Sequence, residues 1–315
     1  MKILSFSGFV PEQICDTVRF TQYTGDRNIS HYCGYASDFI SRVLKDDSID
    51  GAVYPRTCDS TRIISSYLSD SGKFHFGISI PPAGAVGADA FLASSFREYK
   101  EALEKHFDIS IGDDVIRDRA EKIDRRNACI RKLCEERESH SFADHLGAIH
   151  GLLEKPLSDR EVLPVIRKCD ASDRKVFVIG SFLSNIKIAG HIDEAGLTVV
   201  GDSLPESGRL ASVRPVKPSG DIFLDIARSM LSMRLSPTQD SFRQIMETDM
   251  EEIGRSSAKG VIYITQKYCE PYDYLYSIYK DAAAALGVPV LRLQLNDTED
   301  DRKVSLALEA FADTL

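Results

Sequence analysis

The sequence has no apolar run long enough to cross a membrane. A transmembrane helix needs about 20 consecutive, mostly apolar residues, and every apolar stretch of this 315-residue chain is shorter. The first residues, Met1 to Ser7, have the pattern of a buried strand and lack the charged, apolar and small-residue regions of a signal peptide. We therefore expect a cytoplasmic protein with no membrane partner.

The sequence also has no block of basic residues. Its 39 Lys and Arg residues are outnumbered by 48 Asp and Glu residues, the formal net charge is −9, and the two signs are mixed along the chain. Binding to nucleic acid requires clustered positive charge. We therefore expect no nucleic-acid partner.

Two common nucleotide-binding motifs are missing as well. The chain contains no Gly-x-x-x-x-Gly-Lys-Ser/Thr phosphate loop, and the segment Gly84-Ala85-Val86-Gly87 lacks the glycine spacing of a dinucleotide fingerprint. Neither ATP nor NAD is expected to bind this chain through those motifs.

The cysteine count does not indicate a disulfide framework. The chain has seven cysteines, which is an odd number, and a reducing compartment keeps thiols free. A chain of this length can bury an ordinary core without covalent links. The cysteines are therefore apolar filler, reactive thiols or metal ligands.

Strand-like and helical runs alternate along the chain, which predicts parallel sheets covered by helices. Expected strands are Lys2 to Phe6, Gly51 to Tyr54, Lys73 to Ile80, Lys175 to Gly180, Leu197 to Val200, Gly260 to Thr265 and Val288 to Leu295. Expected helices are Tyr35 to Leu44, Cys58 to Leu68, Asn185 to Ala195, Ser219 to Leu231, Tyr272 to Leu286 and Arg302 to Asp313.

The length and the break in this alternation predict two α/β domains, at residues 1–155 and 156–315, each Rossmann-like or flavodoxin-like. From Ala88 to about Arg137 apolar residues recur at mostly three- to five-residue steps, so this section is a helical extension of the first domain. A helical stretch near residues 140 to 173 would join the two domains. Pockets favour such boundaries and the carboxyl ends of parallel strands.

Three cysteines occupy the expected carboxyl edge of a sheet. Cys58 follows the strand at Gly51 and precedes a helix, Cys269 follows the strand ending at Thr265, and Cys33 lies in a loop leading into a helix. The other four cysteines do not pass this test: Cys129 and Cys134 fit ordinary helix positions, and Cys15 and Cys169 fit a turn and a linker.

A thiol at a helix N-terminus is expected to have a lowered pKa, which favours the thiolate that a metal needs. In a cytosolic protein such thiolates select zinc or an iron–sulfur cluster. The 24 and 210 residues between the three cysteines do not match the close pairs of structural zinc sites. The spacing fits a cluster held between two domains. One alternative is that the three cysteines are unrelated. Another is that Cys58 is a nucleophile that acts with a distant His.

Several segments together resemble the catalytic subunits of 2-hydroxyacyl-CoA dehydratases and benzoyl-CoA reductases, including the 2-hydroxyglutaryl-CoA dehydratase D-component. The resemblance runs through nearly the whole chain. The order and spacing of the matching segments are more specific than any single segment. The segments are Tyr32-Cys33-Gly34, Pro55-Arg56-Thr57-Cys58-Asp59, Phe74 to Pro81, the helical section with Asn127 and Arg131, Gly180 to Asn185, Glu194 to Asp202, Gly260 to Tyr272, Gly287 to Leu291, and Leu308 to Phe311.

This resemblance implies that Cys33, Cys58 and Cys269 hold a 4Fe-4S cluster, with an iron–sulfur site between the two α/β domains. It also implies an oxygen-sensitive enzyme, a lyase or an oxidoreductase, that acts on an acyl-CoA thioester through a ketyl radical. The implied partners are a homologous second subunit, in a homo- or heterodimer, and an ATP-hydrolysing iron–sulfur activator that supplies single electrons at low potential.

Four polar residues near the expected site are further candidates. Ser37 and Ser181 are candidates for contacting substrate or sulfur, with helix capping as the alternative. Arg56 and Lys267 flank proposed ligands and could balance cluster charge or bind a CoA phosphate, with surface solvation as the alternative. The family usually has an acidic residue after the last strand, where Asp297 is the nearest candidate here.

Two alternatives to a catalytic iron–sulfur subunit remain open from sequence alone. One is a non-catalytic partner subunit, structural or relaying electrons, that helps bind a true catalytic subunit. The other is a metal-free, two-domain binding protein for a small molecule.

Overall fold

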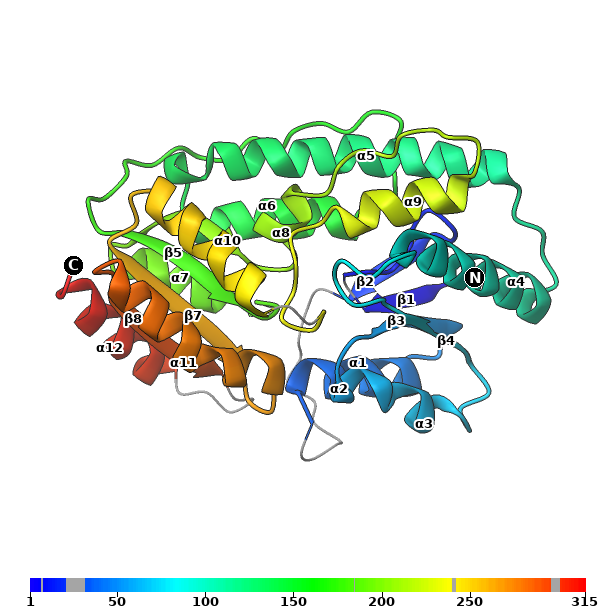
Figure 1. The fold of residues 1–315 in the computed structure, drawn as a ribbon, viewed down its shortest axis with the longest axis horizontal. Helices are drawn as coiled ribbons and strands as arrows, with labels where there is room; N and C mark the ends of the chain where they lie inside the picture. The colour runs from blue at the N-terminus through cyan, green and yellow to red at the C-terminus, as the bar shows by residue number, and fades with distance from the viewer. Residues whose placement is uncertain (7, 21–31, 184, 240–241, 296–300) are drawn as a thin grey trace.

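The computed structural model describes residues 1–6, 8–20, 32–183, 185–239, 242–295 and 301–315, and it contains two parallel sheets side by side (Figure 1). The first sheet has the strand order β2-β1-β3-β4. Its strands are β1 (Ile3–Phe6), β2 (Thr17–Phe20), β3 (Gly51–Arg56) and β4 (Phe74–Ser79). All three pairings are parallel.

The second sheet repeats this arrangement. Its order is β6-β5-β7-β8, again with parallel pairings only. Its strands are β5 (Lys175–Gly180), β6 (Thr198–Ser203), β7 (Gly260–Gln266) and β8 (Val290–Leu295). Two parallel four-stranded sheets confirm the α/β architecture expected from the alternating pattern.

Helices cover both faces of the first sheet because its strands are apolar on both sides. One face carries α1 (Gly34–Lys45), α2 (Asp59–Arg62) and α3 (Ile64–Leu68), and the other carries α4 (Ala88–Phe107) and α9 (Ile222–Leu231) (Figure 1). Alternate residues of one strand serve the two faces: Tyr54 packs with Phe39 of α1, whereas Val53 belongs to the cluster that contains Phe96 of α4.

The second sheet is covered in the same way. One face packs against α6 (Phe142–Glu154), α7 (Lys187–Glu194) and α12 (Asp301–Ala312), and the other against α10 (Phe242–Arg255) and α11 (Glu270–Ala285). The remaining helices are α5 (Asp113–Glu135), the short 3-10 turn at Arg137–Ser139 and α8 (Gly208–Ala211). Figure 1 shows α5 running along both sheets. Among the described residues, no helix is both long and apolar enough to span a bilayer.

Helices cross between the two halves of the chain. Helix α9 belongs to the second half of the sequence but packs against α4, since Phe223 and Ile226 lie in the core cluster of the first sheet. Helix α6 packs the other way, against α7 and the second sheet. Within residues 140–173 only the α6 part is helical, so the expected helical linker is half right. The division at residue 155 stays a prediction.

Candidate functional site

One pocket lies where the strand order of both sheets reverses. In doubly wound sheets, ligands bind outside the carboxyl ends of the strands at this reversal point. Here the reversal falls between β1 and β3 and between β5 and β7, and residues just after all four strands line a single pocket. We call it the thiol pocket; its lining residues are Phe6, Gly8, Phe9, Cys33, Tyr35, Ala36, Pro55, Thr57, Cys58, Ser60, Thr61, Ser181, Phe182, Pro205, Arg209, Met233, Ser236, Thr238, Gln266, Cys269 and Tyr272.

The thiol pocket brings together the three cysteines singled out from the sequence. It encloses about 780 Å³, including its opening to solvent, and Cys33, Cys58 and Cys269 all line it. Each is the residue immediately before a helix: Cys33 before α1, Cys58 before α2 and Cys269 before α11. The expected position of each thiol at a helix start is therefore confirmed, and residues more than 200 positions apart in sequence meet.

Local hydrogen bonds fix the two cysteines beside the first sheet, Cys33 and Cys58. The backbone N–H of Cys33 donates to Ser60 Oγ at 3.2 Å, and the backbone N–H of Cys58 donates to Thr61 Oγ1 at 3.1 Å. The Cys58 thiol lies 3.7 Å from the same Thr61 hydroxyl. Because Ser60 and Thr61 are buried in the first turn of α2, this short helix holds both thiols toward the pocket.

The backbone around Cys269 is bent into the pocket. Tyr268 adopts a left-handed conformation with φ of 64°, which is uncommon for a residue with a side chain. Pro271 then occupies the first turn of α11, where its missing N–H costs nothing. The strand β7 thus turns sharply into α11, with Cys269 at the turn.

The three thiols affect one another, which corrects an expectation from the sequence. A helix N-terminus was expected to lower each pKa, but the pKa of Cys269 is raised well above its ordinary value, first by a hydrogen bond with the Cys33 thiol and then by burial. Burial is also the main cause of a raised pKa at Cys58. Burial and mutual proximity outweigh the helix dipole at these two thiols, so a thiolate there needs a cation beside it.

The donor set fits a cluster better than a single ion. Within the described residues, no three His, Cys, Asp or Glu side chains stand close enough to hold one metal ion. A single zinc ion needs all its sulfur ligands within about 2.3 Å of one point, whereas the ligands of an iron–sulfur cluster bind different irons and stand further apart. Three partly buried thiols from separate loops, with no carboxylate lining their pocket, suit the second case.

Residues at and after the ends of second-sheet strands supply polar side chains to the pocket that Cys33 and Cys58 also line. The hydroxyl of Ser181, directly after β5, is buried and has no hydrogen-bond partner among the described residues. Arg209 is 1% exposed, and its Nη1 donates to the Tyr272 hydroxyl at 2.7 Å. Gln266 donates to the carbonyl of Phe182 at 3.4 Å. These side chains give the pocket hydrogen-bond donors without a lining carboxylate.

The other candidates from the sequence lie away from this wall. Ser37 is fully buried inside α1, its hydroxyl has no partner in the part of the chain that the structure describes, and it does not line the thiol pocket. Arg56 is exposed at the end of β3, and the Lys267 ammonium lies 4.9 Å from the centre of the Tyr268 ring. Neither cation lines the pocket. Asp297 lies outside the described residues.

The remaining four cysteines are separate from the thiol pocket. Cys129 and Cys134 lie on α5, as expected, and Cys15 is fully buried in the core of the first sheet. Cys169 is exposed. Sequence reasoning missed Arg209, the buried cation of the pocket wall. The sequence feature that could have indicated Arg209 is its position a few residues after the carboxyl end of β6.

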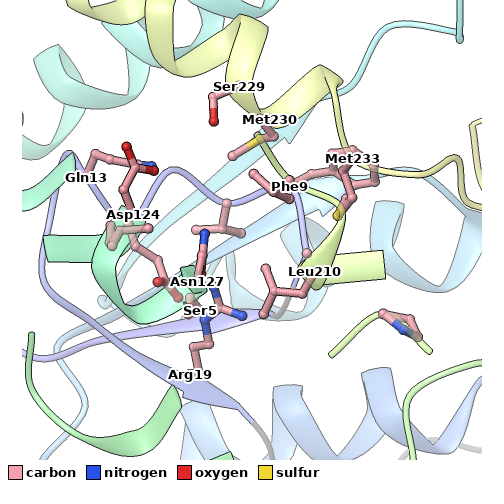
Figure 2. Close-up of a pocket in the computed structure, with 16 residues that line it drawn as sticks. Ser5, Phe9, Gln13, Arg19, Asp124, Asn127, Leu210, Ser229, Met230 and Met233 are labelled. Carbon is pink, nitrogen blue, oxygen red and sulfur yellow. Dashed lines mark hydrogen bonds and ion pairs between the residues drawn. The ribbon is translucent and has the colours of Figure 1, made fainter. Parts of the chain in front are cut away.

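A second cavity adjoins the thiol pocket and shares Gly8, Phe9, Pro205 and Met233 with it. We call it the adjoining cavity; it encloses about 640 Å³, including its opening to solvent. Figure 2 shows Gln13, Asp124 and Asn127 toward one end, and Phe9, Leu210 and Met233 toward the other. The side-chain carbonyls of Gln13 and Asn127 are buried without a partner among the described residues.

Charge in the adjoining cavity is neutralised locally. The buried Glu12 carboxylate binds Arg19 and, at 2.5 Å, Arg126 Nη2 of α5. These two arginines help hold the pKa of Glu12 at about 2, against the effect of burial. Burial raises the pKa of the nearby Asp124.

Comparison with known proteins gives a family match over nearly the full chain. The family described as 2-hydroxyglutaryl-CoA dehydratase, D-component, matches residues 3–315. The (R)-phenyllactyl-CoA dehydratase beta subunit of Clostridium sporogenes is 21% identical over 144 residues, which are 45% of this chain and 38% of that protein. The matched part is therefore less than half of that relative.

A solved structure of a Mn-bound periplasmic metal binding protein, in mutant form, from Candidatus Liberibacter asiaticus covers 100% of this chain and 99% of its own. Its sequence identity is 10% and its TM-score is 0.28, so it carries no argument about this protein. The match to the dehydratase family, in contrast, leaves only the first two residues uncovered. The chain belongs to the 2-hydroxyglutaryl-CoA dehydratase D-component family.

Proposed function

We propose that this chain is the 4Fe-4S-bearing subunit of a 2-hydroxyacyl-CoA dehydratase or a related acyl-CoA reductase, with Cys33, Cys58 and Cys269 as the cluster ligands. The observation that carries the proposal is the meeting of these three thiols, from both domains, in one pocket at the reversal points of both sheets. Membership of the dehydratase family supports an acyl-CoA thioester as the substrate class.

When bound, the cluster would supply single electrons at low potential and an open iron for the thioester oxygen. The chain's own residues do the rest. Ser60 and Thr61 orient the first-domain ligands, and the apolar side chains of Phe9 and Phe182 keep water from the reacting carbon. Ser181, with its free buried hydroxyl, would donate to the substrate.

The reaction needs a negative charge on the thioester oxygen. One electron added to the carbonyl puts charge on that oxygen and weakens the bond to a neighbouring hydroxyl group, which leaves as hydroxide. A proton then leaves the adjacent carbon, which completes the loss of water. Net loss of water is neither oxidation nor reduction, so the electron leaves the product again and the enzyme is a lyase. If a second electron and two protons enter instead, the substrate is reduced by two electrons and the enzyme is an oxidoreductase.

The adjoining cavity would hold the part of the substrate beyond the thioester. It shares the lining residues Phe9 and Met233 with the thiol pocket. Its apolar end is the end at which Phe9 and Met233 lie. Its polar end carries the side-chain carbonyls of Gln13 and Asn127, which have no partner among the described residues (Figure 2). A substrate group with an apolar stem and an uncharged hydrogen-bond donor would match this order.

The proposed partners are a homologous second subunit and an ATP-hydrolysing iron–sulfur activator. The beta-subunit name of the Clostridium sporogenes relative supports a multi-subunit enzyme. Arg56 and Lys267 lie outside the pocket wall, so we propose the phosphates of CoA as their target, and Ser37 as a residue that supports the Cys33 loop. A cytoplasmic, oxygen-sensitive dimer is the expected form.

The deciding experiment measures iron and acid-labile sulfide per chain after anaerobic purification. Wild type should hold about four of each, and Cys58→Ala should lose most of both. The matched control is Cys129→Ala, on α5 and outside the pocket, which should keep the wild-type content. Wild-type protein that takes up no iron during anaerobic reconstitution would contradict the proposal and favour a metal-free binding protein.

A further inference from the structure

Arg209 is the most deeply buried cation that lines the thiol pocket. It is 1% exposed, lies in the short helix α8, and is held on one side by Tyr272 and Ser203. Its Nη1 donates to Tyr272 Oη at 2.7 Å and its Nε donates to Ser203 Oγ at 3.3 Å. The guanidinium carbon also lies 5.8 Å from the centre of the Tyr272 ring. The side chain is therefore fixed in direction.

The third nitrogen of this guanidinium is unused. Nη2 of Arg209 has no hydrogen-bond partner among the described residues, and none of their carboxylates forms an ion pair with Arg209. The charge of Arg209 is balanced only indirectly. The Ser203 hydroxyl donates a hydrogen bond to Asp249 Oδ1 at 2.8 Å, and Asp249 also accepts one from the Tyr279 hydroxyl. A buried guanidinium with a free N–H costs desolvation energy, so such a group in a pocket wall calls for a ligand.

A second unpartnered donor stands on the same wall. The hydroxyl of Ser181 is buried, at 7% exposure for the residue, and is without a partner among the described residues. Both Ser181 and Arg209 come from the second domain, and both line the pocket that the thiols of the first domain also line. Two unpartnered donors in one pocket, one of them cationic, are complementary to a ligand whose oxygen carries negative charge.

We propose that Arg209 Nη2, with Ser181 Oγ, forms an anion site in the thiol pocket that binds the negatively charged oxygen of the substrate. The inference rests on the proposed function for the identity of that oxygen, which is the thioester oxygen after it receives an electron. A fixed donor pair stabilises charge that develops during a reaction without reorganising. Tyr272 and Ser203 are positioning residues, since they act only through Arg209.

The site can be tested on the full chain without iron, by comparing two alkylating reagents. Iodoacetate is an anion and iodoacetamide is neutral, but both attack the same thiolate and release iodide. Their rate ratio at one thiol therefore cancels its pKa and accessibility and reports local charge. Peptide mass spectrometry reads the ratio at Cys58 and Cys269, and the exposed Cys169 gives the reference value in the same protein.

The variants are Arg209→Met and Arg209→Lys, with Arg234→Met as the matched control. Arg234 is another largely buried arginine, but it binds Glu252 and the carbonyl of Asp202 and does not line the pocket. Arg209→Met should lower the iodoacetate preference at the pocket thiols roughly 3- to 30-fold, the range for one nearby charge at intermediate dielectric. Arg209→Lys should restore much of it, and Arg234→Met should leave it unchanged.

An unchanged ratio in folded Arg209→Met would overturn the anion site. If that variant does not fold, the wild type decides: acetate, compared with chloride at equal ionic strength, should slow iodoacetamide at Cys58 but not at Cys169, and no slowing overturns the proposal.

Iron content distinguishes two negative groups that Arg209 could neutralise, a substrate oxygen and the cysteine thiolates. Arg209→Met purified anaerobically should keep the iron of wild type. Selective iron loss, absent from Arg234→Met, would mean that Arg209 balances the thiolates instead of a substrate oxygen. Iron-free wild-type protein would contradict the proposed function alone, because the alkylation ratio still tests the anion site.

Discussion

The thiol of Cys33, at the start of α1, hydrogen-bonds with the thiol of Cys269, at the start of α11. The two residues are 236 positions apart and precede helices that cover different sheets, so this contact joins the two sheet layers at the thiol pocket. It also means that a group bound by both thiols would resist separation of the domains.

The first prediction concerns oxidation after metal removal. Because the Cys33 and Cys269 thiols are in contact, chelation of iron followed by mild oxidation should give a Cys33–Cys269 disulfide as the major product. Non-reducing peptide mapping identifies the pair. In Cys33→Ser this product is absent, and Cys129 with Cys134, five positions apart on α5, serves as the comparison pair. Full alkylation of Cys33 and Cys269 after oxidation would contradict the contact.

The second prediction concerns Glu206, which lies beside the pocket wall. Its Oε1 accepts the backbone N–H of Leu183 at 2.7 Å, while Oε2 is buried without a partner among the described residues. Burial first, and then the charge of Asp202, raise its pKa from 4.5 to about 7, whereas Arg209 lowers it. The protonated form is therefore the one that the fold prefers.

A raised pKa stabilises the fold fully below about pH 4.5, and this contribution is lost as the pH rises through about 7. The shift corresponds to about 3 kcal/mol. Glu206→Gln, which is neutral at every pH, should thus unfold at higher urea than wild type at pH 8 and lose that advantage at pH 5. Urea titrations at the two values measure it. If the difference in urea midpoint between the two proteins is the same at both pH values, Glu206 is not a buried carboxyl that the fold keeps neutral.

Strand-end positions were predictable from the sequence because they follow from a general rule. Parallel strands end at one edge of a sheet, so Cys58 and Cys269 could be placed at such an edge from local pattern alone. The chemistry of the pocket was not predictable in the same way. The raised thiol pKa values depend on burial and on the Cys33 contact, and Arg209 becomes notable only because tertiary packing buries it and leaves one nitrogen free.

The path of the chain shows the same limit. The apolar periodicity of α9 predicted a helix correctly, but periodicity does not say which sheet the helix covers. Phe223 packs on the first sheet although it follows β5 and β6 of the second. Strand β2 was missed because only Val18 and Phe20 of its four residues are apolar.

The third prediction uses the close approach of β5 and β7. A Cβ added at Gly180 would lie 2.6 Å from the carbonyl oxygen of Ile264, the acceptor of the Ser181 backbone N–H. Gly180→Ala should force the strands apart at the pocket and destabilise the protein by about 1–3 kcal/mol. Gly190→Ala is the control, because nothing lies within 4 Å of its added Cβ inside α7. Equal urea midpoints for the two variants would refute the steric argument.

The last prediction concerns the buried ion pairs of Glu12 in the adjoining cavity. Glu12 connects the loop after β1 to β2 through Arg19 and to α5 through Arg126. Its pKa is lowered from 4.5 to about 2, so its contribution is present above about pH 4.5 and is lost as the pH falls toward 2. The shift corresponds to about 3 kcal/mol.

Glu12→Gln should therefore destabilise the protein by about 3–5 kcal/mol at pH 7, because it leaves two buried arginines without their carboxylate. The deficit relative to wild type should shrink as the pH is lowered from 5 to 3, since wild type then begins to lose the same charge. Urea titrations of both proteins at the three pH values give the comparison, and the exposed Glu101→Gln on α4 is the control for loss of a carboxylate alone. A deficit that stays constant over this pH range would show that packing, and not charge, accounts for the role of Glu12.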